Sequence, residues 1–208
     1  FVSGGSTHTY LTSIAAFNYF NYGGESLIVA RVTSGSYTSA TAIVSGSNGS
    51  GSFTLETISE GLLMNNTSSV GQANDFLQSG SRDNIRWEVT NSNTTLGTFS
   101  LLIRQGNDVS NNKIVLEQFD NLSMDPNQPN YISKVIGDQK LSYQSSTNQM
   151  EITGNYVNSS RYVRVKEVHT PIFNYLDSNG LPKDGGQFTG SLPGTGSGLY
   201  TGSFAGAI

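Results

Sequence analysis

The stretch NIRWEVTNSNTTLGTFSLLIRQG, residues 84–106, decides the fold class. Its first part places Ile85, Trp87 and Val89 on one face and charged residues on the other, which is the period-two alternation of a half-buried strand. A polar turn follows, and TFSLLIRQ then supplies a second strand. The sequence therefore predicts an antiparallel β-hairpin with Trp87 in the core.

Four further segments are predicted to be strands, because they are short, rich in β-branched or aromatic residues and bounded by turn residues. They are TAIV (41–44), SFTLETIS (52–59), KIVLEQFDNLS (113–123) and NSSRYVRVKEV (158–168). The third of them follows the hairpin after the turn GNDVSNN, which favours an antiparallel neighbour. We expect an α+β, β-rich fold of antiparallel sheets or sandwich-like modules with few short helices.

The N-terminal part of the chain predicts a helix, a stop and a buried strand in immediate succession. STHTYLTSIAAFNYFNY (6–22) has an approximate helical stripe of apolar residues. The pair Gly23-Gly24 supplies the positive φ that often ends a helix. SLIVARVT (26–33) is apolar on both faces, which is typical of a central strand.

Two connecting segments have recognisable signals. DPNQPNYISKVIGD (125–138) offers Asn130 as an N-cap, one or two helical turns, and Gly137 as the stop. EGLLMNNTSSVGQANDFLQSGSRDN (60–84) contains turn residues throughout, so we expect a long, exposed connection.

The composition excludes several classes of function. Charged residues make up 12% of the 208 residues and the net charge is −4, without any basic run, which argues against a nucleic-acid partner. No stretch approaches the roughly 20 apolar residues of a membrane span, so no direct membrane insertion is expected. The chain contains no cysteine, which excludes disulfides and thiolate chemistry.

The residue types that usually carry catalysis or bind metals are scarce. The two histidines, His8 and His169, lie in no recognised spacing; a Ser-His-Asp site that uses His169 stays open as an alternative. Asp120 and Asp125 are expected to cap turns rather than bind an ion. The glycine-rich GSNGSGS (46–52) lacks the following helix of a phosphate-binding loop. We therefore predict no catalytic, cofactor-binding or metal-binding residues, and no enzyme.

Three arginines fall within predicted strands, at Arg86, Arg104 and Arg164. One interpretation is a solvated sheet face on which each arginine has a Glu or Asp as its cross-strand neighbour. The other is pairing between subunits, since arginine is enriched at interfaces. The first interpretation is favoured because exposed ion pairs are worth little.

Several segments together resemble the tail sheath proteins of contractile-tailed bacteriophages. They are AAFNYFNYGGESLIVARV (15–32), FTLETISEG (53–61), KIVLEQFDNLSMDPNQPNYISKVIGD (113–138) and SRYVRVKEV (160–168). Each motif alone is weak, and it is their order and spacing that carry the resemblance. One segment departs from it: many relatives have Gly-x-Trp-Gly-Asn where this chain has EGLLMNNTSSVGQ (60–72).

The resemblance implies both an organisation and a function. It implies that residues 1–33 belong to an α/β sheath core, 34–170 to a β-rich sheath domain, and 171–208 to a Gly-rich segment leading into a further domain that this internal fragment lacks. It also implies a structural subunit whose copies form stacked hexameric rings around the tail tube, contact the baseplate, and contract to deliver the genome. The implied location is the virion, after assembly in the host cytoplasm.

Two other functions are weighed against this one. A carbohydrate- or receptor-binding β-module of a tail fibre or adhesin could use the ten tyrosines and the tryptophan for stacking on sugars. The pattern around Trp87 argues against that residue, because its neighbours mark it as core. A hydrolase built on His169 lacks recognisable partners.

Overall fold

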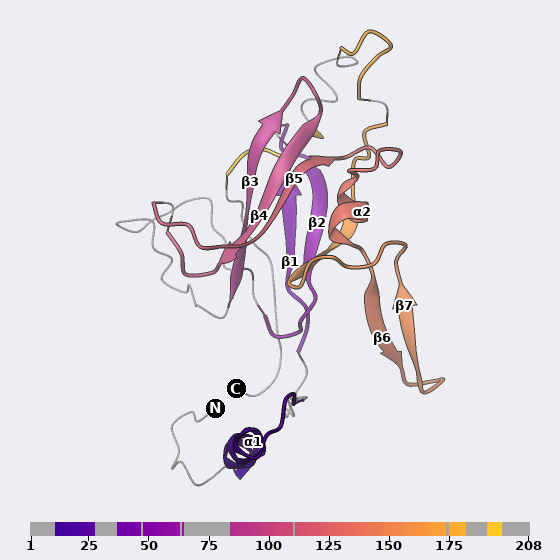
Figure 1. Cartoon of the computed structure of the whole chain (residues 1–208). Coiled ribbons are helices and arrows are strands. Elements are labelled where there is room, and N and C mark those ends of the chain that lie inside the picture. Colours follow the sequence, from indigo (N-terminus) through magenta and orange to yellow (C-terminus); the bar gives the residue numbers. More distant parts are fainter. Residues whose placement is uncertain are drawn as a thin grey trace. The chain divides into compact units, whose positions relative to one another are not determined.

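The computed structural model describes residues 11–27, 37–46, 48–62, 64, 84–109, 111–173, 175–181 and 191–196. Apart from the last two residues of the chain, it divides into two compact units, Phe1–Ser34 and Gly35–Gly206. Figure 1 shows the helices and strands of both units.

The first unit contains helix α1, Leu11–Asn21. The N–H of Gly23 donates to the carbonyl of Phe20, and Gly23 has a φ of 90°, the positive value expected of a helix stop. Gly24 lies so close to the ring of Tyr19 that a Cβ there would be 2.2 Å from a ring carbon. Most of the strand expected over 26–33 lies outside the described residues, so the complete helix–Gly-Gly–strand unit stays a prediction.

The second unit is built from antiparallel sheets, which confirms the predicted β-rich fold class (Figure 1). One sheet has the order β1-β2-β8, formed by Thr41–Ser45, Gly51–Thr57 and Val163–Val168. Another has the order β3-β4-β5, formed by Ile85–Asn93, Thr98–Gln105 and Val115–Ser123. A further sheet among the described residues is a two-stranded hairpin of β6, Lys140–Gln144, and β7, Gln149–Thr153.

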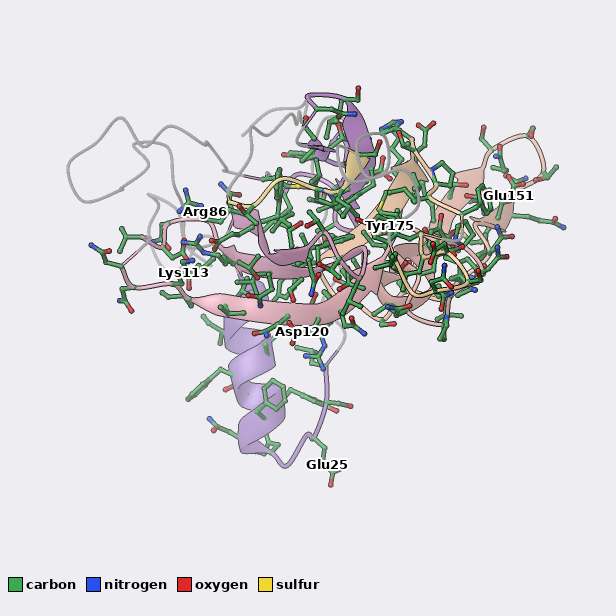
Figure 2. The ribbon with its side chains drawn as sticks, turned by 90° about the horizontal axis from the view of Figure 1, so that it is seen from above. Glu25, Arg86, Lys113, Asp120, Glu151 and Tyr175 are labelled. Atoms are coloured by element: carbon green, nitrogen blue, oxygen red, sulfur yellow. The ribbon has the colours of Figure 1, made fainter. Side chains whose placement is uncertain are left out.

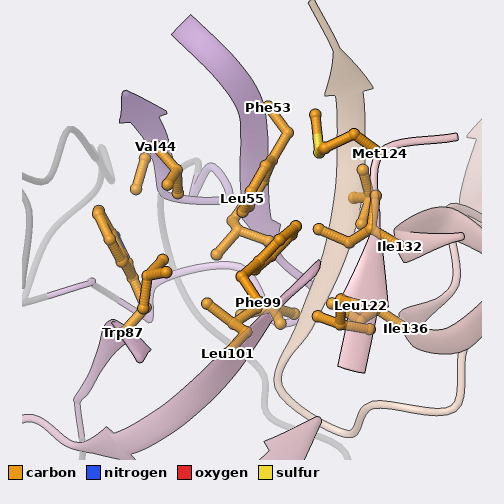
Figure 3. Packing of buried hydrophobic residues seen from close by; sticks show 14 of the residues in the cluster. Val44, Phe53, Leu55, Trp87, Phe99, Leu101, Leu122, Met124, Ile132 and Ile136 are labelled. Atoms are coloured by element: carbon orange, nitrogen blue, oxygen red, sulfur yellow. The ribbon is translucent and has the colours of Figure 1, made fainter. Parts of the chain in front are cut away.

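The core lies between the two three-stranded sheets (Figure 3). Phe53 of β2 and Phe99 of β4 stack with ring centroids 5.8 Å apart and both are almost fully buried. Trp87 is 3% exposed, which confirms the prediction that it belongs to the core. Alternation along the strands thus turns one face of each sheet inward, because burial of apolar area is the main favourable term in folding.

Helix α2, Ile132–Ile136, packs its two isoleucines against this core. The predicted stop is confirmed, since Gly137 is the C-cap with a φ of 104°. The predicted N-cap is wrong: Tyr131 occupies that position, and the side-chain amide of Asn130 instead donates to the carbonyl of Asn121 at 2.6 Å. That bond ties the segment before the helix to the end of β5.

The connection predicted to be exposed over 60–84 is largely outside the described residues, but the expectation is wrong at Met64. Met64 is fully buried and forms a parallel bridge with Ile85 at the start of β3. Strand β8 also begins later than predicted, because the hydroxyl of Ser160 accepts the N–H groups of Tyr162 and Val163 and so holds a turn there.

Segments after Pro171 contribute to the same core. Ile172, Tyr175 and Leu192 are all buried in it. The hydroxyl of Tyr175 donates to the carbonyl of Thr94 in the β3–β4 turn, and burial raises the pKa of this phenol. The hairpin β6–β7 was not foreseen from the sequence, and no strand was predicted between 139 and 157.

Candidate functional site

His169 is the residue that could have carried a hydrolytic site. Its Nε2 is hydrogen bonded to Oγ1 of Thr54 at 2.7 Å, and its Nδ1 lies 3.6 Å from Oε1 of Glu167. A hydroxyl, an imidazole and a carboxylate therefore follow one another, which is the general arrangement of an activated nucleophile.

The surroundings of this trio suit a structural hydrogen bond better than catalysis. Thr54 is 7% exposed, and it lies on β2 between its antiparallel partners Ile43 and Glu167. Because so little of Thr54 is exposed, its hydroxyl is poorly accessible to a substrate carbonyl. The backbone N–H of His169 also donates to the carbonyl of Ser52 at 2.9 Å, so the histidine continues the contact between β2 and the end of β8. His8 lies outside the described residues.

The predicted surface position of Arg86 and Arg104 is wrong, since the two residues are 2% and 1% exposed. They are direct cross-strand neighbours on β3 and β4, a placement that brings like charges together. Asp108, from the connection between β4 and β5, compensates for this. Its Oδ1 accepts from Nη1 of Arg86 at 3.0 Å and from Nη2 of Arg104 at 2.8 Å, and its Oδ2 accepts from Nε of Arg104 at 2.7 Å.

The other charged groups of this cluster are paired as well. Glu88 accepts from Nη1 of Arg104 at 2.8 Å and from Nζ of Lys113 at 2.7 Å. Asp108 also accepts from the N–H of Ile114 at 2.9 Å through Oδ2, and from Nη1 of Arg86 at 2.9 Å through its backbone carbonyl. Figure 2 shows Arg86 and Lys113 in the same region of the second unit. Because the carboxylate oxygens already accept bonds from the protein, the cluster supports the packing of the sheet rather than offering a site for a ligand.

Arg164 is also mostly buried, at 9% exposure, but it keeps the neighbour that the sequence predicts. Glu56 lies directly across from it in β2, and Nε of Arg164 donates to the Glu56 carboxylate at 2.7 Å. Nη1 of Arg164 donates to the carbonyl of Asp138 at 3.0 Å. Lys140 and Lys166 each approach the same carboxylate to 3.8 Å.

Of the two aspartates considered for ion binding, Asp125 caps a turn as predicted, whereas the prediction is wrong for Asp120, which lies in a strand. Oδ1 of Asp125 accepts the N–H of Asn127 at 2.9 Å, which is the turn capping that the sequence predicts. Asp120 lies on β5 and accepts from the amide of Gln118. Among the described residues, no group of three or more His, Asp or Glu side chains is placed to hold a metal ion. In the β1–β2 turn, Gly49 has a φ of 80°, typical of a hairpin connection.

The hairpin β6–β7 carries the feature that the sequence analysis missed. Its register pairs Leu141 with Ile152 and Tyr143 with Met150. Since side chains alternate across a strand, these four lie on one face, which we call the apolar face of the hairpin. Their exposed fractions are 60%, 62%, 60% and 56% in that order. Figure 1 shows the hairpin extending away from the two three-stranded sheets.

The base of this hairpin is firmly held. The carboxylate of Asp138 accepts the N–H groups of Asn155 and Tyr156 at 2.8 and 2.7 Å. The side chain of Asn158 accepts from the N–H of Gln139 at 3.0 Å and donates to its carbonyl at 2.7 Å. These bonds join residues 138–139 to residues 155–158 at the base of the hairpin. At this point the two strands leave the sandwich, the name used here for the two three-stranded sheets and the core between them.

No family model, curated protein or solved structure matches this chain. Among the helices in the described part of the chain, none has the length and apolar character needed to cross a membrane.

Proposed function

We propose that this chain is a structural subunit of a contractile phage tail sheath, which polymerises around the tail tube and contracts to drive the genome into the host. The observation that carries the proposal is the ordered set of sheath-like motifs between residues 15 and 168. Its partners would be other copies of the chain in stacked hexameric rings, together with tube and baseplate proteins. Its location would be the virion, after assembly in the host cytoplasm, and it would perform no catalysis.

The architecture of the second unit is compatible with this mechanical role. The sandwich pairs its buried charges internally, as the contacts of Asp108 and Glu56 illustrate, so its packing does not depend on a ligand. A subunit that changes neighbours during contraction must keep its own fold while its contacts are exchanged. A difference of about a few kcal/mol per subunit between two arrangements would add up over many copies.

Exposed apolar side chains lie where such contacts could form. On helix α1, Phe17 is 66% exposed and Phe20 is 48% exposed. The hairpin of the second unit adds its apolar face. The two phenylalanine side chains are three residues apart and so share one face of the helix, and exposed apolar side chains of this kind suit a partner surface.

Negative-stain electron microscopy of the purified full chain over a range of salt concentrations tests the proposal. A sheath subunit is expected to form rings or hollow tubes of uniform diameter. Particles that stay single under every condition would count against it.

A carbohydrate-binding module is the second candidate, and one observation keeps it in view. Trp87 is buried and cannot stack on a sugar, but Tyr143 is 60% exposed and its hydroxyl donates to Asn148 at 2.8 Å. Affinity electrophoresis in gels that contain bacterial surface polysaccharide separates the two functions. Retardation of the wild-type chain that is lost in Tyr143→Ala would favour the sugar-binding function.

A further inference from the structure

Residues 191–196 contact both three-stranded sheets, each at an edge strand. β1 stands at one end of the order β1-β2-β8, and β3 stands at one end of the order β3-β4-β5. The N–H of Gly194 donates to the carbonyl of Ser45 in β1 at 3.0 Å. The N–H of Gly196 donates to the carbonyl of Val89 in β3 at 2.8 Å, and the N–H of Val89 donates back at 3.3 Å. One short segment, drawn in yellow beside β3 in Figure 1, therefore joins the two sheets, and we call it the strap.

The strap is held less extensively than the strands that it joins. Its pairing with β3 is an isolated bridge at Gly196, whereas β3 pairs with β4 along most of its length. Leu192 is its apolar anchor, 1% exposed in the core, and the hydroxyl of Ser52 donates to the carbonyl of Ser191 at 2.6 Å. Thr195 is exposed, and the strap contains glycine, which loses more backbone freedom on ordering than any other residue. Segments with few buried apolar side chains open at a lower free energy than core strands do.

We propose that the strap is a releasable closure of the sandwich, which opens and recloses while the strands of both sheets stay paired. In the open state, β3 at Val89 and β1 at Ser45 lose the backbone partners that the strap supplies. Unpaired N–H and C=O groups at a sheet edge are able to pair with an extended segment of another chain. The closed strap occupies these edges from within the chain, so its opening controls access to them. This inference goes beyond the proposed function and does not depend on it.

Val89 and its two neighbours on β3 distinguish opening of the strap from unfolding of the sheet. The N–H groups of successive residues in an antiparallel strand point to opposite edges. The N–H of Val89 points to the strap. Those of Glu88 and Thr90 therefore point to β4, where both residues have register partners. Protection of the Val89 amide from exchange with water thus depends on the strap, and protection of its neighbours depends on the sheet.

Amide hydrogen exchange of the full-length chain, followed by NMR at increasing low concentrations of urea, tests the inference. We expect the amide of Val89 to exchange together with those of Gly194 and Gly196. It should exchange faster than the amides of Glu88 and Thr90, and with a weaker dependence on urea, because a local opening exposes little surface. If Val89 exchanged at the same rate and with the same urea dependence as its two neighbours, the strap would open only with the whole fold and the inference would be wrong.

Variants of the anchor give a second test. Leu192→Ala should raise the exchange rate of the Val89 amide roughly tenfold to a hundredfold, since it removes most of a buried side chain. Leu192→Asp should abolish the protection of Val89 while Glu88 and Thr90 stay protected. Leu181→Asp is the matched control, because this leucine is 60% exposed, and it should leave all three amides unchanged. Loss of protection at all three amides in Leu192→Asp, or full protection of Val89 in that variant, would overturn the inference.

Discussion

The sandwich and the hairpin of the second unit differ in which side chains they bury and which they expose. The sandwich buries Arg86, Arg104 and Asp108 together beside its strands, at exposures of 3% or less. The hairpin turns Leu141 and Ile152 outward, with about three fifths of each side chain exposed. Both regions are antiparallel β-structure built from alternating sequences, so secondary structure alone does not explain the difference.

The difference shows which region finds partners for its buried charges and cover for its apolar side chains within one copy of the chain. A buried charge is tolerated only when its partners are close and well placed, and the sandwich supplies those partners from its own connections. Exposure of an apolar face to water is unfavourable. Within the part of the chain that the structure describes, nothing covers the apolar face of the hairpin. The sandwich therefore specifies the fold of the second unit, whereas the hairpin leaves its apolar face exposed.

Asp108→Ala is expected to have the largest effect. It leaves two buried guanidinium groups facing each other without their shared carboxylate, and the loss of free energy of unfolding should reach the upper part of about 3–5 kcal/mol. Urea denaturation followed by the fluorescence of Trp87 measures it. The matched control Asp120→Ala, at an exposed position of β5, should change stability by less than about 0.5 kcal/mol. Equal effects would mean that the buried cluster does not support the sandwich.

Trp87→Ala should be the next most damaging change. Removal of a large aromatic side chain from a packed core costs about 3–5 kcal/mol, through lost burial and the cavity left behind. Circular dichroism during urea denaturation measures the loss without relying on tryptophan emission. In the native protein, the emission of Trp87 should be blue-shifted relative to water; a water-like maximum would contradict its buried position.

Gly137→Ala tests the anchor between the sandwich and the hairpin. Gly137 has a φ of 104° and a ψ of 153°, a region used almost only by glycine, and a Cβ there would lie 2.3 Å from Cα of Asn158. We expect a loss of about 2–3 kcal/mol in chemical denaturation. Gly49→Ala has positive φ but open space around it, so it should cost only about 1 kcal/mol. A Gly137→Ala variant as stable as Gly49→Ala would show that the close approach is easily relieved.

The smallest loss of stability is expected for an isoleucine-to-threonine change in the hairpin, and the same change in the core of the sandwich serves as the comparison. Ile103→Thr buries a hydroxyl in the core and should cost about 2–4 kcal/mol. Ile152→Thr changes an exposed side chain and should stay within about 0.5 kcal/mol in dilute solution. Parallel urea titrations at low protein concentration compare the two. A large loss for Ile152→Thr would mean that the hairpin packs within its own chain.

The strands of the sandwich could be predicted because each has one face toward the core, which imposes alternation on the sequence. The ends of elements were harder to predict. The side chain of Asn130 is used in a contact with the carbonyl of Asn121, and Ser160 holds a turn where a strand was expected. Both depend on contacts between segments that a local pattern does not contain.

The burial of the arginines could not be predicted from the strands alone. Alternation correctly placed Arg86 on the face opposite Trp87, but it says nothing of what covers that face. The carboxylate that covers it belongs to Asp108, in a connection whose sequence predicts only a turn. For Arg164 the cross-strand pair with Glu56 was within reach of sequence reasoning, whereas its burial was not.

The hairpin did leave a signal that sequence reasoning missed. KLSYQSSTNQMEIT (140–153) contains two short alternating runs on either side of the polar turn SSTN. Each run has only two apolar residues, because just one face is apolar and no core extends the pattern. Such a pair of weak strands is easily mistaken for a polar loop.

Sedimentation velocity of the full chain over a wide range of concentrations tests most directly the central claim, that the sandwich is complete within one copy whereas the hairpin exposes an apolar face. The sedimentation coefficient of the wild-type chain should rise with concentration, whereas that of Leu141→Lys/Ile152→Lys should stay at the single-copy value with an unchanged unfolding midpoint. Equal sedimentation of the two proteins at every concentration would contradict the account.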